Sequence, residues 1–270
     1  MTIFKFKNTI SITTIAAVLT FGTSCTAQVI QTPASETSTN ATVMTISPGD
    51  KKFKMPDFEN YEAIYNSAMG KNGRFSLQAR KSGNGKTIFL TDTIPMKDNI
   101  IIAQRVINAK THRAEFYAGP YFAWGKEYVV RKNTHDGYGL SRIPLGGGEA
   151  IHTAGKLANG GGVDVMFSPT LASLMPMAVG TAFKMPAIYP RKGGLISSEF
   201  DDYLVLRTEK LELASGVSCA CWVIEKTAWS DGSKTQYWVS REAPFMYRRH
   251  RDVGGKRDFV SDVQSYREMK

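Results

Sequence analysis

The chain lacks the features that most readily identify a protein's activity. Its apolar stretch at 10–21 is only 12 residues long, whereas a membrane-spanning helix needs about 20. The four histidines show no H-x-x-x-H or H-E-x-x-H spacing, and no serine lies in a G-x-S-x-G turn. The sequence therefore predicts no catalytic residue, no metal site and no cofactor.

Acidic residues are fewer than basic ones, with 24 Asp and Glu against 34 Lys and Arg, a net charge of +10. Lys5 and Lys7 are the charged residues of the first 24, so their removal would leave +8. The densest basic segment is Arg248–Arg251. Anionic lipid or acidic polysaccharide would suit such a surface, but we favour a solvated strand face or loop with an ordinary basic bias. No motif indicates nucleic-acid binding.

Residues 1–24 have the layout of a signal peptide. A positively charged start and the apolar stretch 10–21 precede the small residues Gly22-Thr23-Ser24-Cys25. Cleavage before Cys25 would free this cysteine for acylation, and several acyl chains would anchor the protein stably. Cleavage after Ala27 would instead release a soluble protein. We expect the first, and hence an exported lipoprotein of the periplasm or outer membrane.

Residues 25–50 are predicted to form a tether between this anchor and the folded part. The segment is rich in Ser and Thr and contains Pro33 and Pro48, a composition that cannot bury a core. The remaining 220 or so residues, 51–270, suffice for one well-buried domain.

Short apolar runs separated by Gly, Asn, Asp and Pro indicate a succession of β-hairpins in this domain. The expected strands are 75–79, 86–90, 100–102, 114–124 (broken by Gly119-Pro120), 127–131, 138–143, 203–213, 217–229, 235–240 and 245–251. Short helices are expected at 57–69 and 168–176, the second as a plug at an open end. The predicted fold is all-β: a curved antiparallel meander forming a half-open barrel or sandwich.

Several local features were assigned to turns or packing. Asp201-Asp202 is predicted as a turn before the strand at 203, and Gly146–Gly148 and Gly160–Gly162 as flexible connections. Cys219 and Cys221 would point to the same face of a strand, where a disulfide between them is geometrically awkward. We expect them to be two small apolar residues on a buried face.

The C-terminal half resembles a large family of exported bacterial domains of unknown function. The resemblance rests on Phe167–Gly180, on Gly216 followed by Cys221-Trp222-Val223, and on Gln236-Tyr237-Trp238-Val239-Ser240 before a basic strand. It covers about 160–250 and implies a curved antiparallel sheet. By analogy of fold alone, such a sheet is similar to lipoprotein carriers that hold acyl chains.

Aromatic and methionine side chains are the most suggestive candidates for a binding site. On a concave sheet they would line an apolar cavity; alternatively, they fill an ordinary core. The predicted liners are Phe116, Phe122, Trp124, Met175, Trp222 and Trp238. The sequence thus favours an exported envelope protein that binds a lipid or apolar ligand. A structural or interaction protein without a cavity is the alternative, and a hydrolase is a distant third.

Overall fold

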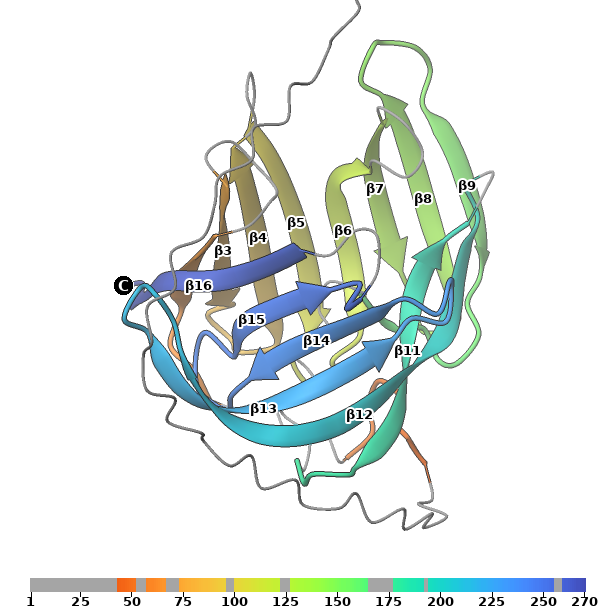
Figure 1. Cartoon of the computed structure of the whole chain (residues 1–270). Coiled ribbons are helices and arrows are strands. Elements are labelled where there is room, and N and C mark those ends of the chain that lie inside the picture. Colours follow the sequence, from red (N-terminus) through yellow and green to blue (C-terminus); the bar gives the residue numbers. More distant parts are fainter. Residues whose placement is uncertain are drawn as a thin grey trace, which may run out of the picture. The chain divides into compact units, whose positions relative to one another are not determined.

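The computed structural model describes residues 43–51, 57–66, 73–95, 100–121, 127–164, 177–191, 194–254 and 259–270. These ranges contain sixteen strands and no helix (Figure 1). The strands are β1 (Met44–Thr45), β2 (Tyr61–Asn66), β3 (Arg74–Lys81), β4 (Thr87–Pro95), β5 (Ile100–Asn108), β6 (Ala114–Tyr121), β7 (Glu127–Asn133), β8 (Gly137–Pro144), β9 (Ile151–Lys156), β10 (Val163–Asp164), β11 (Ala182–Pro190), β12 (Ile196–Glu212), β13 (Ser218–Thr227), β14 (Lys234–Val239), β15 (Met246–Arg251) and β16 (Phe259–Glu268).

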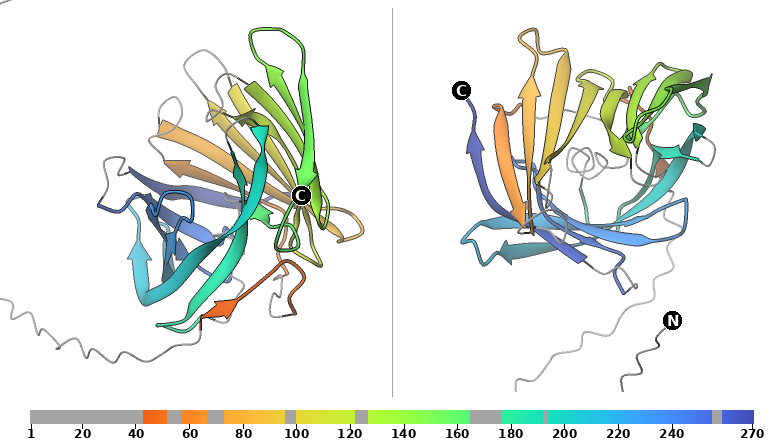
Figure 2. Two further views of the ribbon diagram at one scale, coloured as in Figure 1. Left: turned by 90° about the vertical axis from the view of Figure 1, so that its right-hand side faces the viewer. Right: turned by 90° about the horizontal axis from the view of Figure 1, so that it is seen from above.

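All sixteen strands belong to one sheet. Its order is β1-β11-β12-β13-β14-β15-β16-β2-β3-β4-β5-β6-β7-β8-β9, with β10 paired to β11 beside this path. The strands β2–β9 and β11–β16 form two antiparallel meanders, and the pairing of β16 with β2 joins them. The sheet is curved, and β12–β16 run across β2–β5 (Figures 1 and 2). The predicted all-β fold with a curved, open meander is confirmed.

Three groups of buried side chains hold the bent sheet together. The first joins β2–β5 to β12–β16 and includes Tyr65 and Val223. The second lies along β11–β14 and includes Ile46 and Ile224. The third joins β6–β8 to β11 and β12. Because the neighbours Val223 and Ile224 are both fully buried but belong to different groups, β13 is buried on both faces.

The folded domain begins earlier than the predicted boundary at residue 51. Met44 pairs with Phe183 of β11, and Ile46 is 0 % exposed. The end of the segment predicted as a tether is therefore part of the sheet, because one short apolar run there finds a buried partner.

The helix predicted over 57–69 is wrong, since Tyr61–Asn66 is the strand β2. Tyr61, Ala63 and Tyr65 are buried while the residues between them are more exposed, which is the two-residue period of a strand. The second predicted helix, 168–176, lies outside the described residues.

Two predicted interruptions are also wrong. Asp201-Asp202 lies inside β12, and Gly119-Pro120 lies inside β6, where both residues pair with β7.

The predicted flexible connection at Gly160–Gly162 is packed against the sheet. Gly161 and Gly162 are buried, and the Ser198 hydroxyl donates a hydrogen bond to the Gly161 carbonyl.

Gly119 is required by close packing rather than by a turn. A Cβ atom at this position would lie 2.9 Å from both the Ala103 Cβ and the Tyr117 hydroxyl. We expect Gly119→Ala to lower the free energy of unfolding by roughly 1–3 kcal/mol in urea titrations. Gly139→Ala is the matched control, because a Cβ on that β8 residue meets nothing within 4 Å. Equal effects of the two substitutions would contradict the packing argument.

Candidate binding groove

A long β-hairpin, β12–β13, carries the groove. Its strands are 17 and 10 residues long, and a β-bulge lies between Val205 and Arg207. A bulge bends its strand and changes the direction of the side chains beyond it. The following residues pair Thr208 with Trp222 and Lys210 with Ala220, so these four side chains share one face.

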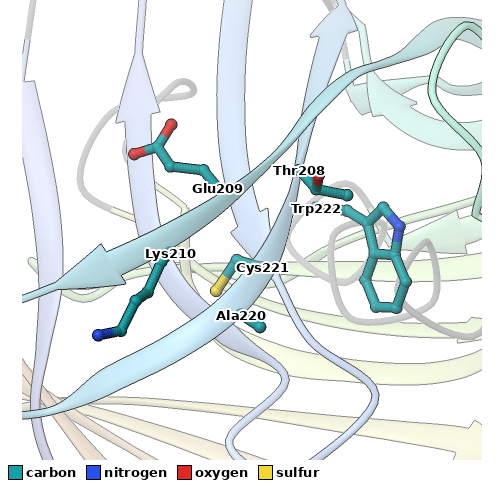
Figure 3. A pocket seen from close by; sticks show the side chains of 6 residues that line it. All are labelled: Thr208, Glu209, Lys210, Ala220, Cys221 and Trp222. Atoms are coloured by element: carbon teal, nitrogen blue, oxygen red, sulfur yellow. The ribbon is translucent and has the colours of Figure 1, made fainter.

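The groove formed there has a volume of about 300 Å³ and opens to solvent. It is lined by Thr208, Glu209 and Lys210 of β12 and by Ala220, Cys221 and Trp222 of β13 (Figure 3). Trp222 is half-buried and packs against the second core group. The second core group therefore fixes the position of the indole, which offers an apolar surface to the groove.

Charged groups surround this apolar surface. The Arg241 guanidinium carbon lies 5.5 Å from the centre of a Trp222 ring, within the range of a cation–π contact. Lys210 is exposed, and its Nζ lies 2.7 Å from the Glu212 carboxylate. The groove thus combines an aromatic surface with cations at its border.

Glu209 is held in its charged form. Burial tends to raise its pKa, but hydrogen bonds from the Trp238 indole (3.1 Å) and the Arg207 guanidinium (2.8 Å) outweigh burial and lower the pKa. Glu209 pairs with Cys221 and Trp238 pairs with Val223, so this hydrogen bond lies on the face of the sheet opposite Trp222, and Trp238 does not line the groove.

The three predicted liners that the structure describes, Phe116, Trp222 and Trp238, do not line one groove together. Trp222 borders the groove, whereas Trp238 pairs with Val223 and so lies on the opposite face of the sheet, in the first core group. Phe116 is half-exposed on β6, paired with Lys132. Cys25, Phe122, Trp124 and Met175 lie outside the described residues.

Cys219 and Cys221 share a face of β13, as predicted, but they form a disulfide, which corrects the expectation of two separate thiols. Their Cα atoms lie 5.6 Å apart, a separation that a disulfide can bridge. Cys221 is buried and Cys219 half-buried. Cys221 borders the groove, but the disulfide lies on the face of β13 opposite Ala220 and Trp222, against the first core group.

A buried polar cluster on the neighbouring strands was not predicted. Asp201 is 0 % exposed, and its carboxylate accepts hydrogen bonds from the Tyr189 hydroxyl and from the Trp229 backbone N–H (2.9 Å). Lys226 Nζ lies 3.4 Å from the second oxygen. Burial and the adjacent carboxylate raise the pKa of Tyr189. Each group here has a structural partner, so we interpret the cluster as support for the hairpin.

Other combinations of reactive residues are sparse in the described part of the chain. The Ser141 hydroxyl lies 2.9 Å from His152 Nδ1 on exposed β8–β9 positions, and no carboxylate contacts this histidine there. No cluster of three metal-binding side chains occurs among the described residues. Likewise, none of their elements is a helix with the length and apolar character to cross a bilayer.

Comparisons with known proteins give no relationship on which to draw. No family model matches the chain, and neither a curated protein nor a solved structure is detectably similar to it. The functional argument therefore rests on the groove itself.

Proposed function

We propose that this protein is an exported, lipid-anchored binding protein of the bacterial envelope, located in the periplasm or at the outer membrane. Its groove on β12–β13 would take an apolar ligand or lipid. The observation that carries the proposal is the position of Trp222, which is packed from behind and borders a solvent-open groove. The volume of about 300 Å³ is at the small end of the range for ligand pockets.

The border of the groove narrows the class of ligand. Trp222 and Ala220 offer carbon surface, while Lys210 places a cation on the same face. An amphiphile with an apolar chain and an anionic end, such as a fatty acid or an acidic lipid, satisfies both parts. The anionic end would compete with Glu212, whose carboxylate lies 2.7 Å from Lys210 Nζ.

Native mass spectrometry of the mature protein, isolated from its own envelope without detergent, tests this directly. We expect acyl chains on Cys25 and a stoichiometric adduct that mild denaturation releases as a lipid. A clean mass for the protein alone, repeated after incubation with envelope lipids, would contradict ligand binding. It would favour the second candidate, a structural or interaction protein, which the three filled core groups also suit.

Trp222→Ala should weaken binding of a fatty acid by about 10- to 100-fold, because the ligand loses one aromatic contact surface. Calorimetric titration measures the affinity. Trp229→Ala is the matched control, since Trp229 is also a half-exposed indole beside an arginine, Arg191, but does not line the groove. Equal affinities for both variants and the parent would exclude Trp222 as a ligand contact.

A further inference from the structure

The strands β4–β8 have a second face, opposite the core, that carries exposed apolar side chains. In β4, Ile88 and Leu90 are buried, whereas Phe89 between them is 45 % exposed. In β5, Ala103 is buried and its neighbour Ile102 is 48 % exposed. We call the exposed side of these strands the outward face.

The strand register brings these side chains into one patch. Phe89 pairs with Val106, and Val106 pairs with Phe116, so a hydrophobic row crosses β4, β5 and β6. Ile100, which is 65 % exposed, and Ile102 lie on the same face of β5, separated from Val106 by the exposed Gln104. Further along the sheet, β8 adds Ile143, 39 % exposed and paired with Tyr128. Contiguous apolar surface of this kind usually marks an interaction site.

The charges at the border of the patch are mostly positive. Arg80 pairs with Phe89 and Lys132 pairs with Phe116, so a cation stands at each end of the hydrophobic row. Arg74, also on β3, adds a third, and all three are exposed. Within the described residues none of the three forms an ion pair. Glu115 at the bulge of β6 accepts a hydrogen bond from the Asn108 amide (2.9 Å). Arg80 also acts electrostatically on Glu62 of β2, whose carboxylate accepts hydrogen bonds from Gln78 and Arg267.

We infer that the outward face is a membrane-docking surface for anionic phospholipid. An apolar centre bordered by cations matches the acyl–headgroup boundary, where carbon surface enters the acyl region and cations meet phosphate. This inference does not depend on the groove or on acylation of Cys25.

The test uses sedimentation of the full chain, carrying Cys25→Ser, with vesicles of phosphatidylglycerol and phosphatidylcholine. Arg80→Gln with Lys132→Gln should lower the partition coefficient about 30-fold and flatten its dependence on salt. Phe89→Ser with Ile102→Ser should lower it about tenfold. Every variant keeps the same N-terminal segment, so differences between them report on the outward face.

Val179→Ser with Leu195→Ser is the matched control, since these residues are 58 % and 56 % exposed but lie elsewhere. It should bind vesicles as the parent does. Equal binding to pure phosphatidylcholine vesicles, or unchanged binding by both outward-face variants, would overturn the inference. Failure to bind vesicles, together with capture of a defined acidic protein that both variants abolish, would assign the surface to a protein partner instead.

Discussion

Replacing Asp201 by Ala should lower the free energy of unfolding by roughly 3–5 kcal/mol. The substitution leaves the Lys226 ammonium, 6 % exposed, without its carboxylate, and it removes the acceptor of the Tyr189 hydroxyl and the Trp229 N–H. A domain of this size is stabilised by only about 5–15 kcal/mol in total. We therefore expect a large shift of the urea midpoint, followed by circular dichroism.

Asp202→Ala is the control for this experiment. The adjacent side chain is exposed on the opposite face of β12, where its carboxylate lies 3.3 Å from Lys184 Nζ. Such surface pairs contribute at most about 1 kcal/mol. Asp201→Asn separates the two causes further, because the amide oxygen can still accept hydrogen bonds but carries no charge. Equal stabilities of the Asp201→Ala and Asp202→Ala variants would refute the assigned role.

Asp92→Ala should have an effect of similar size, about 3–5 kcal/mol of unfolding free energy. Asp92 Oδ2 lies 2.5 Å from Arg105 Nη1, and the two side chains are 10 % and 6 % exposed. The Arg105 guanidinium also lies over the Tyr117 ring, 5.9 Å from its centre, so it cannot move to solvent without disturbing the sheet. Removing the carboxylate takes this ion pair from a buried cation. Thermal and urea unfolding both report the loss.

Two further variants separate burial from ion pairing. Asp57→Ala breaks a pair of the same length, 2.5 Å to Lys81 Nζ, at a fully exposed carboxylate, and should leave stability unchanged. Asp92→Leu combined with Arg105→Met removes both charges and should recover most of the loss. A double variant as unstable as Asp92→Ala would show that the charge itself is not the cause.

The strands were largely predictable from sequence because alternation and turn residues are local signals. Asp231-Gly232 was correctly placed between β13 and β14, whereas 57–69 was assigned to a helix although Tyr61, Ala63 and Tyr65 alternate. Gly119-Pro120 was misread because a glycine required by close packing resembles a glycine required by a turn. Local composition does not distinguish these cases.

The candidate site was predictable only in part. Trp222 was named, but its separation from Trp238 depends on the pairing of Trp222 with Val239 and of Val223 with Trp238. A shift of one residue would have placed both indoles on the same face. The Asp201–Lys226 contact depends on register in the same way, because 25 residues and a complete hairpin connection separate its members. No motif reports such a pairing.

The pairing of β16 with β2 has a consequence for how the molecule is assembled. Arg267 donates hydrogen bonds to Glu62 across 205 positions of the chain, and among the described strands the backbone pairing of β16 with β2 joins the two meanders into one sheet. Ribosomal synthesis therefore delivers β16 after the other described strands. Until it arrives, the facing edges of β2 and β15 have no permanent neighbour and resemble the exposed edges on which misassembly begins. The strand β16 thus also protects those edges.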